Sequence, residues 1–189
     1  MISPPSLVEP RPPWVVFTRR DDPWAGAETA ELVKRGGSVF RLDGRELRDR
    51  SSLFTAFARE LTFPSYFGRN WDALVDCLHD WHSHVGGTDD VAIMIDDADQ
   101  LLHVDFLGIL VSVLCHAAWR ANLQLDADGN PHNDDHWTPR ALHTVFLLGP
   151  TPPVAFAGGA TSDLDVAVVV GDGRLLATLT GPDWPGGEG

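Results

Sequence analysis

The chain has 189 residues, of which 43% are hydrophobic and 22% are charged, so it is long enough to bury the core of one domain. Twenty-seven Asp and Glu residues against fourteen Lys and Arg residues give a formal net charge of -13. This charge repels a phosphate backbone, so nucleic acid is excluded as the expected partner and a basic protein is favoured. No stretch approaches the ~18 apolar residues of a membrane span, and no apolar run follows a basic N-terminal segment. We therefore expect a cytoplasmic protein without a membrane partner.

The cysteine content argues against a disulfide framework. Only Cys77 and Cys115 occur, and both lie within apolar helical patterns. Two such residues supply neither a set of bridges nor a four-ligand zinc site. We expect two buried, reduced thiols.

The N-terminal part predicts a tail followed by a strand and a helix. Residues 1–13, MISPPSLVEPRPP, are rich in proline and show no periodicity, which is typical of a flexible tail. The first strand is expected to start at Trp14. In the helix that follows, Asp22 can cap the N-terminus, Pro23 suits the first turn, and Gly36 can adopt the left-handed conformation that ends a helix.

Strands and helices then alternate along the chain. The predicted strands are SVFRL (38–42), VAIMI (91–95) and HTVFLLG (143–149), and the predicted helices between them include residues 51–61 and 106–119. This alternation predicts an α/β fold with a small, mainly parallel sheet packed with helices. We expect residues 14–149 to form a single domain with its core in 36–149.

The pattern changes after Pro150 to two β-rich runs joined by Gly171-Asp172-Gly173. Turn residues between two apolar runs are a hairpin signal, so we predict an appended β-hairpin over residues 162–181. Residues 182–189 are rich in glycine and proline and predict a second flexible tail.

The segment FPSYFGRNWDALVDCLHDW, residues 63–81, predicts an amphipathic helix with an acidic line. Asn70 is the expected N-cap. At about 100° per residue, one arc is apolar, and it comprises Trp71, Leu74, Cys77, Leu78 and Trp81. The spacing i, i+4, i+8 places three aspartates one above another on a separate line. We call this line the acidic ridge, and its members are Asp72, Asp76 and Asp80.

Helix stability alone does not select the acidic ridge. Like charges at i and i+4 destabilise a helix by ~0.2 to 0.5 kcal/mol per pair. Only Asp72 lies close enough to the helix start to gain from the helix dipole. The spacing leaves two interpretations open, a solvated helix face and a surface that binds a partner.

The run PSYFGRNWDALVDCLHDW resembles a long, ungapped signature of the barstar family, Pro-x-Tyr-Tyr-Gly-x-Asn-x-Asp-Ala-Leu-x-Asp-Cys-Leu. Weaker similarity extends over VFRLDGREL, VAIMI, the helix before Arg120 and TVFLL, so that roughly residues 36–149 are covered. The family consists of intracellular inhibitors of barnase-type secreted ribonucleases. The resemblance implies a small parallel sheet with helices, whose acidic helix and preceding loop plug the nuclease cleft with carboxylates in place of RNA phosphates.

The resemblance also implies which residues bind the partner. Asp76 would be the main anchor, and the later helix segment HAAWRAN offers no Glu for a further acidic contact of the family. Trp71 takes a position that is aliphatic in barstar, Val75 replaces a tryptophan and Arg69 replaces an acid. The implied partner-binding residues are Tyr66, Gly68, Asn70, Trp71, Asp72, Val75, Asp76 and Asp80.

The expected function is therefore that of a non-enzymatic inhibitor or immunity protein, without catalytic residues, cofactor or metal. It would be a monomer when free and would occlude the active site of a basic barnase-like ribonuclease or related toxin. The substitutions Arg69 and Val75 motivate an alternative, in which the same fold binds a different toxin or a regulatory protein and the hairpin over 165–180 contributes the surface.

Two patterns in the sequence could hold a metal ion. Asp96, Asp97 and Asp99 follow a buried strand at the carboxyl edge of the expected sheet, where a metal-dependent hydrolase would hold magnesium. However, the sequence has neither a Gly-rich phosphate loop nor a G-x-S-x-G elbow. The H-x-x-H-x-H pattern at residues 79–84 fits zinc poorly, because no matching pair of ligands is nearby in the chain.

Overall fold

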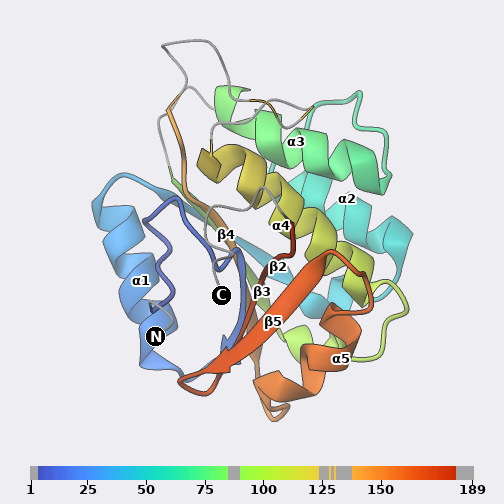
Figure 1. Ribbon diagram of the computed structural model, residues 1–189. Helices are drawn as coiled ribbons and strands as arrows, with labels where there is room; N and C mark the ends of the chain where they lie inside the picture. Colours follow the sequence, from blue (N-terminus) through green and yellow to red (C-terminus); the bar gives the residue numbers. More distant parts are fainter. Residues whose placement is uncertain (1–3, 85–89, 124–127, 129, 131–137, 182–189) are drawn as a thin grey trace.

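The computed structural model describes residues 4–84, 90–123, 128, 130 and 138–181, with the backbone alone for 80–84 (Figure 1). The predicted tail over 182–189 lies outside these residues. Within them, no helix has both the length and the apolar character needed to cross a membrane.

One six-stranded sheet forms the centre of the molecule, with the strand order β2-β3-β4-β1-β6-β5. The strands are β1 (Val15–Arg19), β2 (Ser38–Asp43), β3 (Val91–Asp96), β4 (Leu142–Leu148), β5 (Val166–Gly171) and β6 (Arg174–Leu179). β2, β3, β4 and β1 pair in parallel, whereas β6 pairs antiparallel with both β1 and β5. The predicted α/β class and the C-terminal hairpin are confirmed. The hairpin continues the main sheet, so β1 lies inside the sheet.

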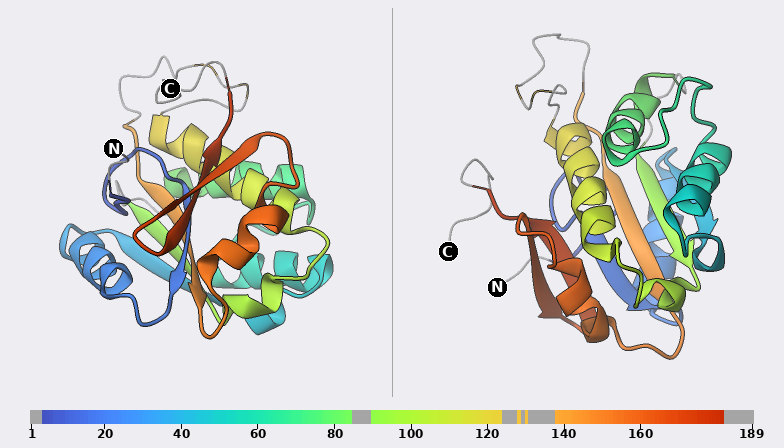
Figure 2. Two further views of the ribbon diagram at one scale, coloured as in Figure 1. Left: turned by 60° about the horizontal axis from the view of Figure 1, so that its bottom comes forward. Right: turned by 90° about the vertical axis from the view of Figure 1, so that its right-hand side faces the viewer.

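Helices cover both faces of this sheet (Figure 2). α1 (Pro23–Lys34) lies on one face, and α2 (Arg50–Glu60), α3 (Trp71–His84) and α4 (Leu107–Leu123) lie on the other. The short elements are η1 (Gly44–Glu46), η2 (Ala98–Leu101), η3 (Pro153–Phe156) and α5 (Ala157–Ala160). Because both faces are covered, β4 is buried along its whole length, as expected of a parallel strand inside an α/β sheet.

Alternation along β1 divides its side chains between the two cores. Val15 and Phe17 belong to the larger core under α2, α3 and α4, and Val16 belongs to the smaller core under α1. Phe17 stacks on Phe146 of β4 with ring centroids 4.4 Å apart. The N-terminal strand is therefore part of the main core.

The predicted ends of α1 are confirmed. Asp22 accepts a hydrogen bond from the Trp24 amide at 2.9 Å, and Pro23 occupies the first turn. Gly36, just beyond the helix, has φ +90°, which a glycine adopts without the steric cost of a Cβ atom.

The segment before β1 differs from the predicted flexible tail. Leu7 is fully buried, and its amide donates to the Glu28 carboxylate on α1 at 2.8 Å. The Trp24 indole donates to the Pro5 carbonyl at 3.0 Å. Prolines lower the conformational entropy that a segment loses on ordering, so a few contacts suffice to hold the described residues 4–13 against α1.

Neither cysteine forms a disulfide. Cys115 is buried in α4, and burial raises the pKa of its thiol. Cys77 is only half-buried, so the prediction of two buried thiols is wrong for this residue. It lies on α3 between the packed leucines and the exposed aspartates, at the border of the apolar arc.

Candidate functional site

The loop before α3 is joined to the helix by a side-chain cap. The Ala73 amide donates to Asn70 Oδ1 at 2.8 Å, and Asn70 Nδ2 donates to the Gly68 carbonyl at 3.3 Å. The predicted N-cap is therefore confirmed. Because one side chain binds both the loop and the first turn, it fixes the loop relative to α3.

α3 has a packed face and an acidic face. Leu74 and Leu78 are buried in the larger core, whereas Asp72 and Asp76 are exposed. The separation predicted from the periodicity is confirmed for these residues. The side chain of Asp80 lies outside the described residues, so its place in the acidic ridge stays a prediction.

Two of the predicted partner-binding residues take part in packing. The Trp71 ring meets Phe54 of α2 edge-on, with centroids 5.0 Å apart, and lies 5.9 Å from the Phe106 ring. Val75 is also half-buried against the larger core. Tyr66, by contrast, is 74% exposed and is the large apolar group that the loop presents to solvent.

Arg69 ties the same loop to α2. Its Nη1 donates to Thr55 Oγ1 at 2.9 Å. Its backbone has φ +49°, a left-handed conformation that costs a non-glycine residue about 1 kcal/mol or more. Asn70 thus binds the loop to α3, and Arg69 binds it to α2. The exposed Tyr66 belongs to this loop.

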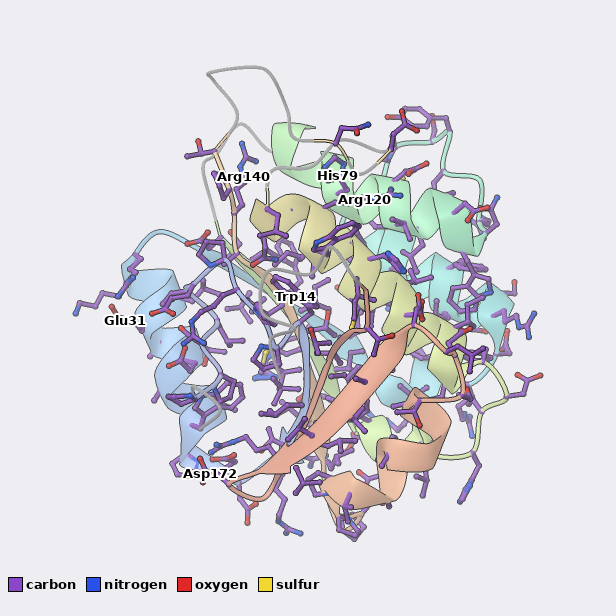
Figure 3. The ribbon with its side chains drawn as sticks, viewed as in Figure 1. Trp14, Glu31, His79, Arg120, Arg140 and Asp172 are labelled. Carbon is purple, nitrogen blue, oxygen red and sulfur yellow. The ribbon has the colours of Figure 1, made fainter. Side chains whose placement is uncertain are left out.

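Asp76 forms an ion pair that local spacing along the chain does not predict. Arg120 of α4 donates through Nη1 to Asp76 Oδ1 at 3.3 Å. The Arg120 side chain is only 20% exposed, whereas the Asp76 side chain is 59% exposed. Figure 3 labels Arg120 where α4 meets α3. The two residues are 44 positions apart, and only the packing of the two helices brings them together.

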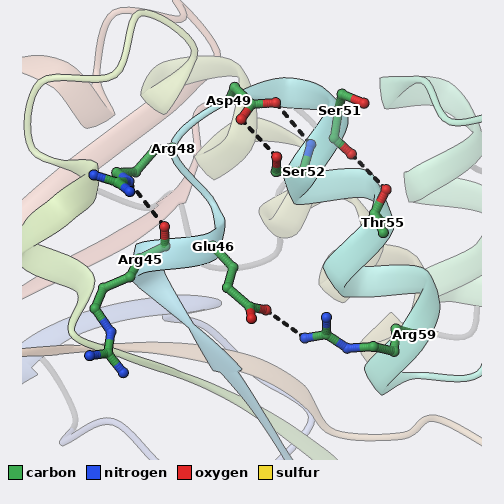
Figure 4. A pocket seen from close by; sticks show the side chains of 8 residues that line it. All are labelled: Arg45, Glu46, Arg48, Asp49, Ser51, Ser52, Thr55 and Arg59. Carbon is green, nitrogen blue, oxygen red and sulfur yellow. Dashed lines mark hydrogen bonds and ion pairs between the residues drawn. The ribbon is translucent and has the colours of Figure 1, made fainter.

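A cleft of about 380 Å³ lies beside α2 (Figure 4). Its lining residues are Arg45, Glu46, Arg48, Asp49, Ser51, Ser52, Thr55 and Arg59. Arg59 pairs with Glu46 at 2.5 Å, and Asp49 caps α2 by accepting from the Ser52 amide and hydroxyl at 2.9 and 2.7 Å. Thr55 connects this cleft to Arg69. The charged groups that line the cleft therefore mainly pair with one another or cap the N-terminus of α2.

The three carboxylates proposed for a metal-dependent hydrolase are each occupied by a different group. Asp96 pairs with Arg41 at 2.9 Å, Asp97 pairs with Arg20 and with Arg45, and Asp99 accepts from the amides of Gly149 and Thr151 at 2.7 and 2.9 Å. Burial raises the pKa of Asp99, but the hydrogen bonds from Thr151 and Gly149 outweigh it and hold that pKa below its usual value. Among the described residues, no group of three His, Cys, Asp or Glu side chains converges on a common point. The contacts of the three aspartates are those of a structural edge of the sheet.

The chain is thus an α/β protein, and one of the helices that cover its sheet, α3, has an N-terminal cap and exposed carboxylates. The family model described as Barstar (barnase inhibitor) matches residues 37–127. This match confirms the resemblance to the barstar family over residues 37–127. A 40-residue segment is 45% identical to the "Putative ribonuclease inhibitor YrdF" of Bacillus subtilis (strain 168). That segment covers 21% of this chain and 44% of the relative, so less than half of the relative's length is matched.

The matched segment does not contain the whole sheet. It includes β2, β3 and the three helices of one face, but β1, β4, β5 and β6 lie outside it. β4 pairs with β3 on one side and with β1 on the other. The sheet under these helices is therefore completed by strands from the flanking parts of the chain.

Proposed function

We propose that this protein is an intracellular, barstar-like inhibitor or immunity protein that occludes the active site of a basic barnase-type ribonuclease. The binding surface would comprise the loop 66–70 and the exposed side of α3, including Asp80. The observation that carries the proposal is the exposure of Asp72 and Asp76 on a capped helix within the barstar-family segment.

The chemistry of such a surface suits a phosphate-binding cleft. A ribonuclease cleft presents Arg, Lys and His side chains, and carboxylates form charge-assisted hydrogen bonds with all three. Asp72 and Asp76 are one turn apart, about 6 Å along the helix axis, so they can meet two cations at once. The constrained loop and the packed helix reduce the conformational entropy lost on binding. The carboxylates offer no bond that the nuclease could cleave.

The remaining parts of the proposal follow from charge and thiol chemistry. A net charge of -13 favours a basic protein over nucleic acid. The two cysteines are not joined in a disulfide, which suits the reducing cytoplasm. We propose no enzymatic activity, cofactor or metal, and a monomer in the free state.

An inhibition assay tests the proposal directly. The purified chain is titrated into a barnase-type ribonuclease, and cleavage of a fluorogenic RNA substrate is followed. We expect inhibition to be complete at an equimolar ratio and a ribonuclease of an unrelated fold to remain active. Full nuclease activity at excess inhibitor, with no complex in gel filtration, would contradict the proposal.

The hairpin supports a second candidate, in which the same fold binds a different toxin or a regulatory protein. The hairpin region exposes Val169 and Val170 on the edge strand β5, and Leu164, just before this strand, is 96% exposed. Exposed apolar groups at a sheet edge are typical of protein contacts. The double substitution Val169→Thr/Val170→Thr separates the candidates, because it should leave nuclease inhibition unchanged if α3 is the binding surface.

A further inference from the structure

The two residues of the ion pair between Asp76 and Arg120 differ in how much of each side chain is exposed. Asp76 extends from the exposed side of α3, and Arg120 reaches it from α4, where most of its side chain is covered. Only Oδ1 of Asp76 accepts from Arg120. In the part of the chain that the structure describes, no group donates to Asp76 Oδ2. One oxygen is therefore held by the protein, and the other is available to a partner.

Packing, rather than other polar contacts, directs the Arg120 side chain. Its Nε is buried and has no hydrogen-bond partner among the described residues. Ala117, three residues before it on α4, and Ala121, the next residue, are buried in the larger core. With only 20% of the side chain exposed, most of the Arg120 stem is covered by protein, and the guanidinium at its end reaches Asp76.

We propose that Arg120 is a positioning residue for Asp76. It holds one carboxylate oxygen against α4 and so orients the other toward a cation of the partner, an Arg or Lys side chain. The inference rests on the proposed function, because it assumes that the exposed side of α3 binds the partner. It adds a specificity-determining residue that lies behind the binding surface.

The opposing possibility is that Arg120 competes with the partner for Asp76. The two possibilities predict opposite effects of Arg120→Gln. If Arg120 only competes, the substitution frees the carboxylate and makes the protein more acidic, so the complex should form faster and last longer. If Arg120 positions Asp76, dissociation should become at least tenfold faster while association stays equal or rises slightly. Arg120→Lys keeps the charge but loses the planar fork, and we expect an intermediate dissociation rate.

Stopped-flow kinetics with a barnase-type ribonuclease test this for wild type, Arg120→Gln, Arg120→Lys, Asp76→Asn and the double variant. Arg35→Gln is the matched control, because Arg35 pairs with Glu31 at the end of α1, on the other face of the sheet. We expect the effects of Arg120→Gln and Asp76→Asn to be non-additive. Slower dissociation of Arg120→Gln, or additive effects, would overturn the proposal.

A failure of the proposed function can be told apart from a failure of this inference. If Asp72→Asn and Asp76→Asn bind as the wild type does, α3 is not the binding surface. If Asp76→Asn weakens binding and Arg120→Gln does not, only the role of Arg120 fails. NMR of the free protein gives a test without a partner: Arg120→Gln should move the side-chain carboxyl ¹³C resonance of Asp76 and leave that of Asp72 in place. An unchanged Asp76 resonance would overturn the positioning role.

Discussion

Arg174 and Asp22 join the C-terminal hairpin to the N-terminal cap of α1 through a bidentate ion pair. Arg174 Nη2 donates to Asp22 Oδ1 at 2.8 Å, and Nε donates to Oδ2. The two side chains are only 13% and 12% exposed, and the guanidinium also lies over the Trp24 ring, 5.0 Å from its centroid. This pair ties together two segments that both lie outside the barstar-family match.

The first prediction concerns acid stability. Burial raises the pKa of Asp22, but hydrogen bonds from Arg174, Thr18 and the Trp24 amide outweigh it and lower the pKa to about 2, from an ordinary 3.8. Because the folded-state pKa is the lower one, the contribution of Asp22 to stability is present above about pH 4 and is lost as the pH falls toward 2. Arg174→Gln should cost roughly 2 to 4 kcal/mol at neutral pH, since it leaves a mostly buried carboxylate without its counter-charge.

Urea unfolding at a series of pH values measures this effect. The free energy of unfolding of the wild type should fall between about pH 4 and pH 2 more steeply than that of Arg174→Gln. Arg35→Gln, which breaks an exposed pair, should keep the wild-type slope. Parallel pH profiles for wild type and Arg174→Gln would mean that the pair does not govern the titration of Asp22.

The second prediction concerns the two described members of the acidic ridge. Asp76→Ala should weaken binding to a barnase-type ribonuclease by several kcal/mol, because a desolvated charge at the centre of an interface is a typical hot spot. Asp72→Ala should have a smaller effect in the same direction. Isothermal titration calorimetry provides the affinities, and Asp21→Ala is the control, since Asp21 is an exposed acid near the N-terminus of α1. An Asp76→Ala variant that binds as tightly as Asp21→Ala would remove Asp76 from the site.

The third prediction concerns the rate of association. If opposite charges steer the encounter, the association rate constant should fall as the salt concentration rises, while dissociation changes little. The Debye length shortens from about 10 Å at 0.1 M salt to about 3 Å at 1 M, so this range is sufficient. Stopped-flow fluorescence measures both constants. Asp72→Ala/Asp76→Ala should show a weaker salt dependence than wild type, and an unchanged dependence would assign the steering to other acids.

The sequence predicted what depends on neighbours along the chain. The Asn70 cap, the packed leucines of α3 and the parallel sheet follow from local spacing, because caps and apolar faces are set within a few residues. The sequence did not predict the pairing of Asp76 with Arg120, because that contact depends on how α3 and α4 pack. The packing of the segment around Leu7 was unpredictable for a related reason: one apolar residue among prolines shows no periodicity, and Leu7 is buried only through its contacts in the smaller core under α1.

The last prediction separates the hairpin's structural role from a role in binding. Deleting residues 163–189 should unfold the protein, because Leu175 and Ala177 are fully buried and pair with Phe17 and Val15 of β1. A deletion would therefore abolish binding whether or not the hairpin meets the partner. Val170→Thr is the cleaner change, since Val170 is 57% exposed, and it should alter the free energy of unfolding by no more than about 0.5 kcal/mol. Under the proposed function it should also leave nuclease inhibition unchanged. Loss of inhibition by a Val170→Thr variant with wild-type stability would instead place the hairpin in the binding surface.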